Sequence, residues 1–485
     1  MFPARIDTLR LLPELILSGA GILLMLAEPF VTRGRRGVFQ TIAVLGAAAA
    51  LVSTIYPAMH TGTAFSGLLR IDGFSIFVHV LVEFTALMVV LGSGDYLERD
   101  HLQKGEYYAL ILFATVGMCV MGSAAELMTA FVGLETSSIS TYILAGFRRD
   151  APRSDESAMK YFLLGSFATA FFLYGVAMIY GATGTTLLGS VTSAGAADPI
   201  PLLKLGLALL LVGLGFKVAA APFQIWTPDV YEGAPAPVTA LMASGPKAAA
   251  FALLTRILAS VGAAGPFWFW ALWISAILTM FAGNLAAIAQ SSVKRMLAYS
   301  SIAHAGYILV ALTAVAASDQ PARGVAAVLY YLAVYALMKL GAFLMLSQIA
   351  GESEEHLQLD DFYGLASRQP VASACFSLFL LSLLGLPATA GFLGKFYIFD
   401  AALSERLIWL AVLLAVNTVI GAYYYLRVIV AMYMREPHQS WEPVKIPFAV
   451  ALVLAISAAG TIYLGLFPGR VMALAMRAAQ SLPLH

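Results

Sequence analysis

The sequence predicts an all-α polytopic membrane protein with about fourteen transmembrane helices. Hydrophobic residues make up 60% of the chain and charged residues only 11%, and the mean hydropathy is +0.85. A soluble domain has about 25% charged residues, so this chain has too much apolar surface for a water-soluble core. Apolar segments long enough to cross a bilayer, about 20 residues each, recur along the whole chain. The formal charge of +1 gives no indication of nucleic-acid binding.

Short connections separate the predicted spans, so the whole chain, residues 1–485, is predicted to be a single integral membrane domain. The first apolar segment contains Glu14 and is not followed by a small-residue cleavage site, which favours a retained span. The longest connection, Gly351–Pro370, contains the acidic sequence GESEEHLQLDD and is expected to be a solvated cytoplasmic turn or a contact with a partner. The predicted spans are 11–29, 38–57, 73–92, 107–122, 125–146, 159–181, 202–221, 236–259, 267–288, 298–316, 323–349, 371–386 continuing after a break to 403, 406–433 and 447–467.

Lysine and arginine in the short connections predict the orientation of the chain. An even number of spans puts both termini on one side. Connections after even-numbered spans contain only Arg70, Lys204, Arg323 and Arg406. Connections after odd-numbered spans are therefore predicted to be cytoplasmic, and both termini outside, because they contain Arg33, Arg35, Arg36, Arg99, Lys104, Arg148, Arg149, Arg153, Lys294, Arg295, Arg368, Arg435 and Lys445.

Proline interrupts two of the spans. The seventh is broken at AAAPF, residues 219–223, and the twelfth at GLPATAGF, residues 385–392. Paired interrupted segments in the two halves of a transporter indicate a transport site. Their spacing predicts two inverted five-helix repeats, spans 4–8 and 9–13. The predicted parts are three N-terminal helices in 1–106, the repeats in 107–260 and 261–433, and a C-terminal helix in 434–485.

Ionisable residues inside the predicted spans are the candidate functional residues. Glu135, Lys217, Lys247 and Lys395 lie near mid-membrane, where a charge costs about 2.5–3.5 kcal/mol on insertion scales. Desolvation disfavours a charged lysine and a nearby carboxylate favours it, so a lysine whose acidic partner moves can take up and release a proton. Glu135 and Lys217 are predicted to pair. The four residues together predict a proton path.

Other ionisable residues fit a structural role as well as a functional one. Lys160 lies one residue inside the sixth span, where its ammonium can also reach the headgroups. His304 is either a hydrogen-bonded core histidine or part of a wet path, since serine and tyrosine surround it. Lys339 is either functional or a structural partner of an acid. The two cysteines, Cys119 and Cys375, lack metal-ligand spacing, and the sequence contains no hydrolytic triad, phosphate loop or metal cluster.

Five long runs resemble a known family: SAMKYFLLGSFATAFFLYGVAMIYGATGTT, FKVAAAPFQIWTPDVYEGAPAPVTALMASGPKAAAF, VKRMLAYSSIAHAGYIL, LLSLLGLPATAGFLGKFYIF and YYYLRVIVAMY. The chain resembles the antiporter-like membrane subunits of respiratory complex I, the proton-translocating NADH-quinone oxidoreductase. It is most similar to the subunit N family, the counterpart of mitochondrial subunit 2. With the fourteen-span layout, the resemblance covers essentially the whole chain.

The resemblance implies a proton-pumping subunit without a redox centre of its own. The key residues of the family fall on Glu135, Lys217, Lys247 and Lys395, and its lysine at the start of the sixth span falls on Lys160. Asp229 lies in the predicted turn WTPDVYEGAP, on the cytoplasmic side, where it would admit protons or fix the helix break.

The resemblance also implies the setting of the chain. No cofactor is expected in this subunit, whereas FMN, Fe–S clusters, NADH and quinone are expected in partner subunits. The expected partners are the lipid bilayer, antiporter-like subunit M and the small subunits K, J, A and H. The expected location is the bacterial inner membrane, with both termini periplasmic.

Two positions depart from the family pattern. Gln224 stands where many members have histidine, which argues against a titratable relay there. The second break reads Pro387-Ala388 instead of Pro-Pro, and one proline still interrupts the helical hydrogen bonds. The rival functions are a subunit of a multisubunit cation/proton antiporter, a stand-alone transporter of a small solute, and a structural membrane scaffold.

Overall fold

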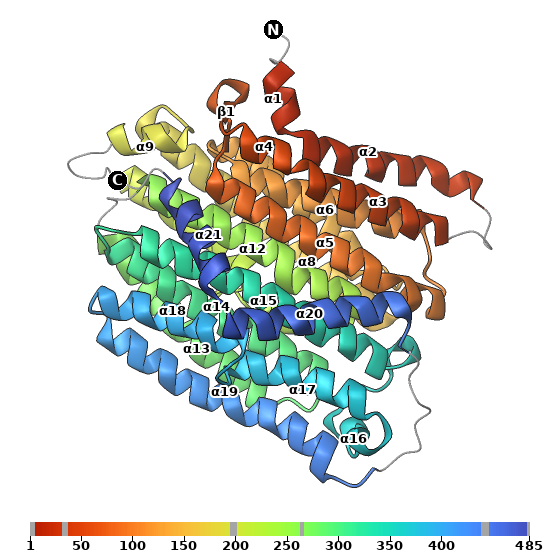
Figure 1. Ribbon diagram of the computed structural model, residues 1–485. Coiled ribbons are helices and arrows are strands. Elements are labelled where there is room, and N and C mark those ends of the chain that lie inside the picture. The colour runs from red at the N-terminus through yellow and green to blue at the C-terminus, as the bar shows by residue number, and fades with distance from the viewer. Residues whose placement is uncertain (1–4, 32–36, 195–200, 262–265, 438–445, 483–485) are drawn as a thin grey trace.

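Long apolar helices make up most of the protein in the computed structural model, which describes residues 5–31, 37–194, 201–261, 266–437 and 446–482. Within these ranges, 12 helices are long and apolar enough to cross a membrane. They run side by side as one bundle (Figure 1). The all-α polytopic fold is thus confirmed. The cationic residues Arg33, Arg35, Arg36 and Lys445, which entered the orientation argument, lie outside the described ranges.

The first half of the chain contains the N-terminal helices and the first broken helix. Its elements are α1 (Arg5–Arg10), α2 (Leu12–Ala27), η1 (Glu28–Phe30), α3 (Gly37–Ser53), α4 (Ile55–Met59), β1 (Gly62–Ala64), η3 (Phe65–Gly67), β2 (Leu69–Ile71), α5 (Gly73–Arg99), α6 (Gly105–Ser123), α7 (Leu127–Ala145), α8 (Pro152–Thr183), α9 (Leu188–Ala194), α10 (Pro201–Val218), α11 (Trp226–Gly233) and α12 (Ala236–Val261). The short strands β1 and β2 pair antiparallel, with Gly62 opposite Ile71.

The second half contains the second broken helix and ends with two helices that cross the bundle. Its elements are α13 (Pro266–Ile288), α14 (Val293–Ala317), α15 (Ala322–Ile349), η4 (Glu352–Glu354), η5 (Leu359–Phe362), α16 (Leu365–Arg368), α17 (Pro370–Leu384), α18 (Ala390–Ser404), α19 (Ile408–Met434), α20 (Phe448–Leu466) and α21 (Gly469–Gln480). The repeat boundaries at 107–260 and 261–433 stay a prediction.

Twelve of the fourteen predicted spans correspond to the twelve long apolar helices. The predicted fifth span is α7, a helix of 19 residues whose polar residues, Glu135 among them, lower its hydropathy. The predicted twelfth span is split by its break into α17 and α18, each of 15 residues. The exact number of membrane crossings therefore stays a prediction.

Helices α12, α14 and α15 form the enclosed centre of the bundle. The buried share of their apolar segments is 94%, 89% and 89%, whereas it is 39% in α19. These three helices contain Lys247, His304 and Lys339. Three of the predicted functional residues therefore lie on the helices least exposed to lipid.

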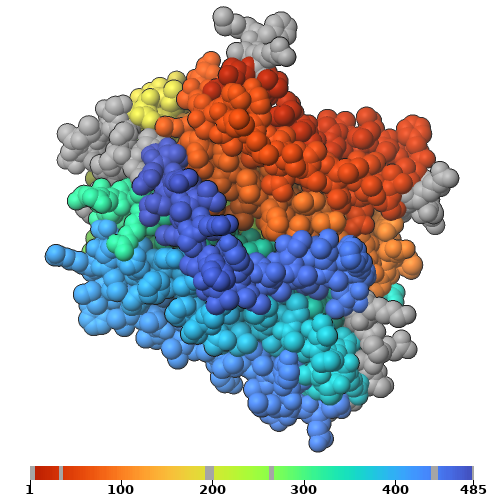
Figure 2. Space-filling view, viewed as in Figure 1, coloured from red at the N-terminus to blue at the C-terminus, as the bar shows by residue number. Residues whose placement is uncertain are grey.

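The C-terminal helices α20 and α21 cover the join between the two halves. Both pack against α5 and against α15, and they cross the face shown in Figure 2 between the orange N-terminal helices and the cyan helices of the second half. Helix α21 was not predicted from the sequence. In Figure 1, α1, β1, α9 and the far end of α21 lie at one end of the bundle, opposite α16.

Both predicted helix breaks are present, and each has a residue in the left-handed backbone region. Helix α10 ends at Val218, and Ala219 follows with φ of 62°. Helix α17 ends at Leu384, and Gly385 follows with φ of 96°, a conformation that glycine adopts without a Cβ clash. The predicted turn WTPDVYEGAP is mostly helical, however, because α11 covers residues 226–233.

The connection that begins at Gly351 differs from the solvated turn that was expected. Glu354 within it is only 7% exposed. Its carboxylate lies 2.5 Å from Lys294 Nζ and accepts a hydrogen bond from the Tyr96 hydroxyl at 2.8 Å. The charge of Lys294 and the hydrogen bond from Tyr96 explain how an acidic side chain of this connection can enter the protein interior.

Candidate functional site

Lys217 lies in the last turn of α10, directly before the first break. Its ammonium donates a hydrogen bond to the Tyr142 hydroxyl at 3.0 Å, and it lies 4.8 Å from the centroid of the Tyr142 ring and 5.6 Å from that of Tyr161. Aromatic faces attract a cation at such distances. The surroundings of Lys217 are therefore aromatic and contain one hydroxyl acceptor.

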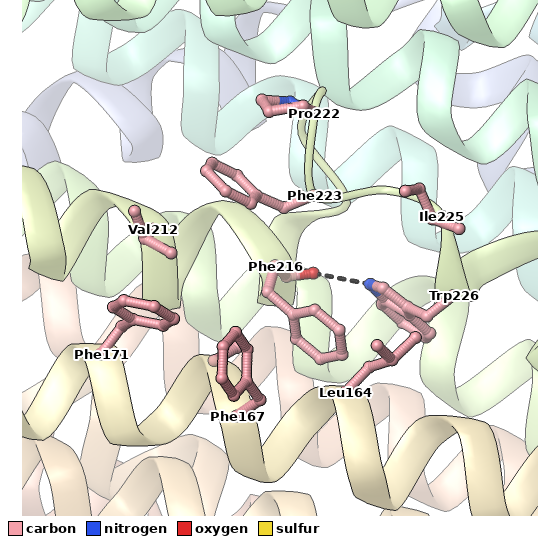
Figure 3. Close-up of a pocket in the computed structure, with 10 residues that line it drawn as sticks. Leu164, Phe167, Phe171, Val212, Phe216, Pro222, Phe223, Ile225 and Trp226 are labelled. Atoms are coloured by element: carbon pink, nitrogen blue, oxygen red, sulfur yellow. Dashed lines mark hydrogen bonds between the residues drawn. The ribbon is translucent and has the colours of Figure 1, made fainter.

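An apolar cavity of about 370 Å³ lies beside this break (Figure 3). Phe167 and Ile225 on its wall are 66% and 73% exposed, so the cavity opens toward the apolar surface of the bundle. On the inner side, Trp226 Nε1 donates to the Phe216 carbonyl at 2.9 Å, the dashed line in Figure 3. The Trp226 ring also stacks on Tyr161, with centroids 4.5 Å apart. The indole thus ties the start of α11 to the end of α10 across the break.

The predicted pair of Glu135 and Lys217 is not an ion pair in this structure. Among the described residues, no cation lies within ion-pair distance of the Glu135 carboxylate, and its Oε1 is buried without a hydrogen-bond partner. Tyr142 lies seven residues further along α7, about two turns away on the same helix face. The hydroxyl of Tyr142, which the sequence analysis did not single out, takes the place beside Lys217 that Glu135 was expected to occupy.

Lys247 is 1% exposed in the middle of α12. Its ammonium donates to the Ser301 carbonyl at 2.8 Å and to the Ser301 hydroxyl at 2.6 Å. The same hydroxyl lies 2.7 Å from the hydroxyl of Tyr335. Within the described ranges no carboxylate pairs with Lys247, and a buried ammonium without a counter-ion is costly. The site suits an amine that passes its proton to hydroxyl neighbours.

Lys339 on α15, in the second half of the chain, has the same kinds of partner as Lys247, a backbone carbonyl and a serine hydroxyl. It is fully buried, and its ammonium donates to the Leu297 carbonyl at 2.9 Å and to the Ser300 hydroxyl at 3.0 Å. No acid partner was found for it in the described part of the chain. The alternative of a structural ion pair for Lys339 is therefore not supported.

His304 lies between the tyrosines of two other helices. Its Nδ1 is 2.6 Å from the hydroxyl of Tyr331, and its Nε2 is 3.1 Å from that of Tyr425. The Tyr425 hydroxyl also hydrogen-bonds Ser300. Hydrogen bonds thus form two groups, one of Lys247, Ser301 and Tyr335 and one of Lys339, Ser300, Tyr425, His304 and Tyr331. The Tyr335 ring brings the groups together, because its centroid lies 5.7 Å from Lys339 Nζ and 5.2 Å from the centroid of His304. We call these eight residues the buried polar network.

Tyr425 is the link between Lys339 and His304, which makes its hydroxyl a sharp test of the network. We expect Tyr425→Phe to slow proton transfer roughly two- to tenfold, matching the loss of about 0.5–1.5 kcal/mol for one hydrogen bond. Tyr330→Phe is the matched control, because the equally buried Tyr330 hydroxyl donates to the Leu464 carbonyl at 2.8 Å, outside the network. Proton uptake by reconstituted vesicles measures both. Equal rates for the two variants would contradict the assignment.

Lys395 follows the second break, in α18. Its ammonium donates to the carbonyls of Leu383 and Leu384 at 3.0 and 2.8 Å, which are among the carbonyls that the end of α17 leaves without helical partners. It also lies 4.8 Å from the centroid of Tyr307. Lys247, Lys339 and Lys395 all act electrostatically on His304. The structure thus gathers these four predicted residues in one region.

Lys160 and Asp229 form a separate group at the surface. The Lys160 ammonium lies 2.6 Å from a carboxylate oxygen of Asp229 and 2.6 Å from one of Glu156, and its side chain is 39% exposed. Arg295 lies 2.8 Å from Asp229 and 2.7 Å from Glu232. Burial alone would raise the pKa of Asp229, but Lys160 and Arg295 together hold it below its usual range. Both predicted residues are ion-paired here, and in the described ranges no hydrogen bond joins them to the buried polar network.

A second ion-pair cluster was missed by the sequence analysis. Lys294, expected in a cytoplasmic connection, is fully buried against Glu354. Glu354 also lies 3.7 Å from Arg148, which pairs with Asp100 at 2.7 Å. No sequence pattern marks these residues as partners.

The tyrosines of the buried polar network could have been found in the sequence, since YYLAVY and YYYLR place several hydroxyls inside apolar spans.

Gln224 lies within the first break, where its Oε1 is buried without a hydrogen-bond partner in the described part of the structure. Because an amide does not titrate near neutral pH and this one orders no neighbour through Oε1, we expect Gln224→Ala to leave turnover nearly unchanged. NADH-driven quinone reduction and proton uptake in vesicles measure the effect. A large loss of either activity would show that the position takes part in transfer.

Comparison with known proteins places this arrangement in a family. Residues 124–421 match the family described as NADH:quinone oxidoreductase/Mrp antiporter, TM. A Solibacter usitatus protein named NADH-quinone oxidoreductase subunit N 1 is 48% identical over 482 residues, which is 98% of each chain. The chain belongs to the subunit N family of NADH-quinone oxidoreductase. The resemblance seen in the sequence motifs is thereby confirmed.

Other relatives of the subunit N family agree. A subunit N of Trichlorobacter lovleyi is 43% identical and covers 97% of this chain and 96% of its own length. A chain of respiratory complex I from Thermus thermophilus, solved with bound aureothin, has a TM-score of 0.81 and 39% identity over 96% of this chain and 99% of that chain. A chain of the Mrp complex from a Dietzia species, at 21% identity and a TM-score of 0.84, covers 99% of this chain and 97% of that chain and shares the fold.

Proposed function

We propose that this subunit of NADH-quinone oxidoreductase conducts protons through the buried polar network, from Lys217 and Lys247 through Lys339 and His304 to Lys395. Electron transfer from NADH to quinone in partner subunits would supply the energy. FMN, Fe–S clusters and both substrates would bind in those partners. The proposed direction of transfer is from the cytoplasm to the outside, with both termini periplasmic.

One observation carries this proposal: two fully buried lysines and a histidine on the most enclosed helices are hydrogen-bonded to serine and tyrosine hydroxyls, and the Tyr335 ring lies between the two hydrogen-bonded groups. A hydroxyl both donates and accepts a hydrogen bond, so a row of hydroxyls can pass a proton between amines. A charge in this region without acid partners is costly. That cost disfavours a purely structural scaffold, and it favours groups that alternate between charged and neutral states.

The proposed partners are the neighbouring membrane-arm subunits. Glu135 lies on a face of α7 whose apolar residues are open: Val132 is 56% and Ile139 53% exposed. An acid with an unsatisfied Oε1 on such a face is positioned to respond to a neighbouring subunit. Subunit M and the small subunits K, J, A and H are the proposed neighbours in the bacterial inner membrane.

Lys217→Ala in the assembled complex tests the proposal. Vesicles with wild-type or variant complex are compared for protons translocated per NADH oxidised, with assembly checked by the subunit content of the purified complex. We expect the variant to translocate fewer protons per NADH. An intact complex with full stoichiometry would remove Lys217 from the path. Lys204→Ala is the control, because Lys204 is an exposed lysine near the start of the same helix.

A further inference from the structure

Three ionisable side chains meet among the N-terminal helices, away from the buried polar network. Glu14 of α2, His79 of α5 and Cys119 of α6 each offer one ligand atom, and these atoms all lie within 4.8 Å of one another. Glu14 is 5% exposed, and His79 and Cys119 are fully buried. Cys119 was not expected to bind a metal, because the two cysteines lack metal-ligand spacing in the sequence. The fold brings it to partners that lie 40 and 105 positions away in the sequence.

The polar atoms in this cluster are incompletely satisfied. Both carboxylate oxygens of Glu14 and Nδ1 of His79 are buried without a hydrogen-bond partner in the described part of the chain. His79 Nε2 lies 3.6 Å from Glu14 Oε1, 2.7 Å from the Ser123 hydroxyl and 3.0 Å from the Cys119 carbonyl. A buried carboxylate without donors is costly, so the cluster lacks a positive or donating group at Glu14.

Glu83 adds a further donor atom at the rim of the cluster. Its Oε1 lies 3.7 Å from the Cys119 sulfur, and its Oε2 accepts a hydrogen bond from the Thr54 hydroxyl at 2.7 Å. Glu83 is fully buried. The Glu83 carboxylate thus lies next to the thiol, at the edge of the group that Glu14, His79 and Cys119 form between α2, α5 and α6.

We propose that Glu14, His79 and Cys119 bind a divalent transition-metal ion of the Zn²⁺ type, with Glu83 or water as the fourth ligand. Thiolate, imidazole and carboxylate are the ligands that zinc takes in proteins. Glu14 as carboxylate and Cys119 as thiolate supply two negative charges, which balance the ion in a low-dielectric interior. On binding, the thiol proton leaves to solvent, together with the proton of the Glu14 carboxyl where that group is protonated, and the metal replaces the contacts of His79 Nε2 with Ser123 and the Cys119 carbonyl.

The geometry requires a small inward movement of the ligands. Tetrahedral ligands lie about 3.3–3.8 Å apart when zinc bonds are about 2.0–2.3 Å long, compared with separations of up to 4.8 Å here. Side-chain rotation can close this gap. Glu14 lies in the first turn of α2 and Cys119 in the last turns of α6, so the site is near the end of the bundle that also has α1 and β1 (Figure 1).

Zinc content of the full-length chain tests the proposal, with Zn²⁺ itself as the probe. The tagged chain is purified with its accompanying subunits and equilibrated with buffered Zn²⁺. We expect Cys119→Ser to contain one zinc less per chain than wild type. Binding should weaken by more than about 10–100-fold, the loss that removal of an outer-sphere partner already causes. Cys375→Ser, which removes the other cysteine, is the matched control and should retain the full content.

A cobalt experiment shows whether the sulfur is a ligand. Co²⁺ bound to wild type and to Cys375→Ser should give a thiolate charge-transfer absorption, and Cys119→Ser should lack it. Equal zinc content and equal Co²⁺ spectra for wild type and Cys119→Ser would overturn the proposal.

An experiment on unaltered protein keeps the proposal testable if Cys119→Ser fails to fold. Under mildly denaturing conditions that open this buried site, Zn²⁺ should slow alkylation of Cys119 in the wild-type chain, followed by mass spectrometry, and leave alkylation of Cys375 unchanged. Glu14→Gln should abolish this protection. Alkylation of Cys119 at the same rate with and without Zn²⁺ would overturn the proposal.

Discussion

Replacing Lys247 by methionine is expected to slow proton transfer through this subunit by about 10²-fold or more, the lower limit of the contribution made by one acid–base group. Methionine fills a similar volume without a titratable atom. Lys247 is 1% exposed and hydrogen-bonds only Ser301 among the described residues. No neighbouring ammonium can take over its contact, because Lys339 is bonded to Leu297 and Ser300.

The measurement is proton translocation by vesicles that contain the assembled complex, together with NADH oxidation in the same sample. Lys204→Met is the control, since it removes an exposed lysine. The control should behave as wild type. A Lys247→Met complex that assembles fully and translocates the wild-type number of protons per NADH would exclude Lys247 from the path.

A second comparison separates charge from hydrogen bonding. Lys247→Arg keeps a cation that does not lose its proton in proteins. If proton release is what matters, Lys247→Arg should fail as Lys247→Met does. If the charge only positions Ser301, Lys247→Arg should restore part of the activity.

Much of the fold followed from the sequence because a bilayer sets helix length directly. Twelve predicted spans match long apolar helices, and both proline breaks occur where they were expected. The short elements α9 and α21 were missed. Helix α21 has only 12 residues, too few for a span, and it lies across α5 and α15 where no sequence rule required it.

The site was predicted residue by residue but not as a set of contacts. Because a charge inside a bilayer is costly, the positions of Lys217, Lys247 and Lys395 within predicted spans are enough to identify them as candidate functional residues. Which atom each ammonium reaches depends on helix rotation and packing, and the sequence does not state them. Tyr142 therefore replaced Glu135 as the hydrogen-bond partner of Lys217. Lys160 lies inside a predicted span, yet its side chain is 39% exposed and its ammonium pairs with Glu156 and Asp229 at the surface.

Glu354 shows that an acidic residue in a connection cannot be assumed to be exposed, since it is buried here. An acidic connection is usually solvated, but here one of its acids neutralises Lys294 and Arg148 inside the protein. Its backbone contact supports the same role, because the Ala236 amide at the start of α12 donates to Glu354 at 2.7 Å. The cluster thereby fixes the start of the helix that contains Lys247.

Glu354→Gln is expected to lower the free energy of unfolding by about 3–5 kcal/mol, because removing one partner of a buried ion pair leaves an uncompensated charge. Lys294 is fully buried and Arg148 is close by at 3.7 Å. Denaturant titration in detergent micelles at pH 7 measures the difference. Glu355→Gln is the matched control, an exposed acid one position away, and should change stability by less than about 0.5 kcal/mol.

The pH dependence of this loss follows from the pKa of Glu354. Burial alone would raise the pKa of the carboxyl, but Lys294 and Arg148 hold it below its ordinary value of 4.5. A carboxylate with a lowered folded-state pKa stabilises fully above the unfolded-state pKa and loses that contribution as the pH falls through the folded-state value. Wild type should therefore exceed Glu354→Gln in stability by the full amount at pH 7. The difference should shrink only below pH 4.5.

A double variant shows whether the charge itself is the cause. Adding Lys294→Met to Glu354→Gln removes the stranded ammonium, and replacing both members of a buried pair is often nearly neutral. We therefore expect the double variant to recover most of the lost stability. The effects of two substitutions at residues in contact on the free energy of unfolding are not additive. If the double variant is as unstable as Glu354→Gln alone, the loss comes from packing of the connection rather than from the ion pair.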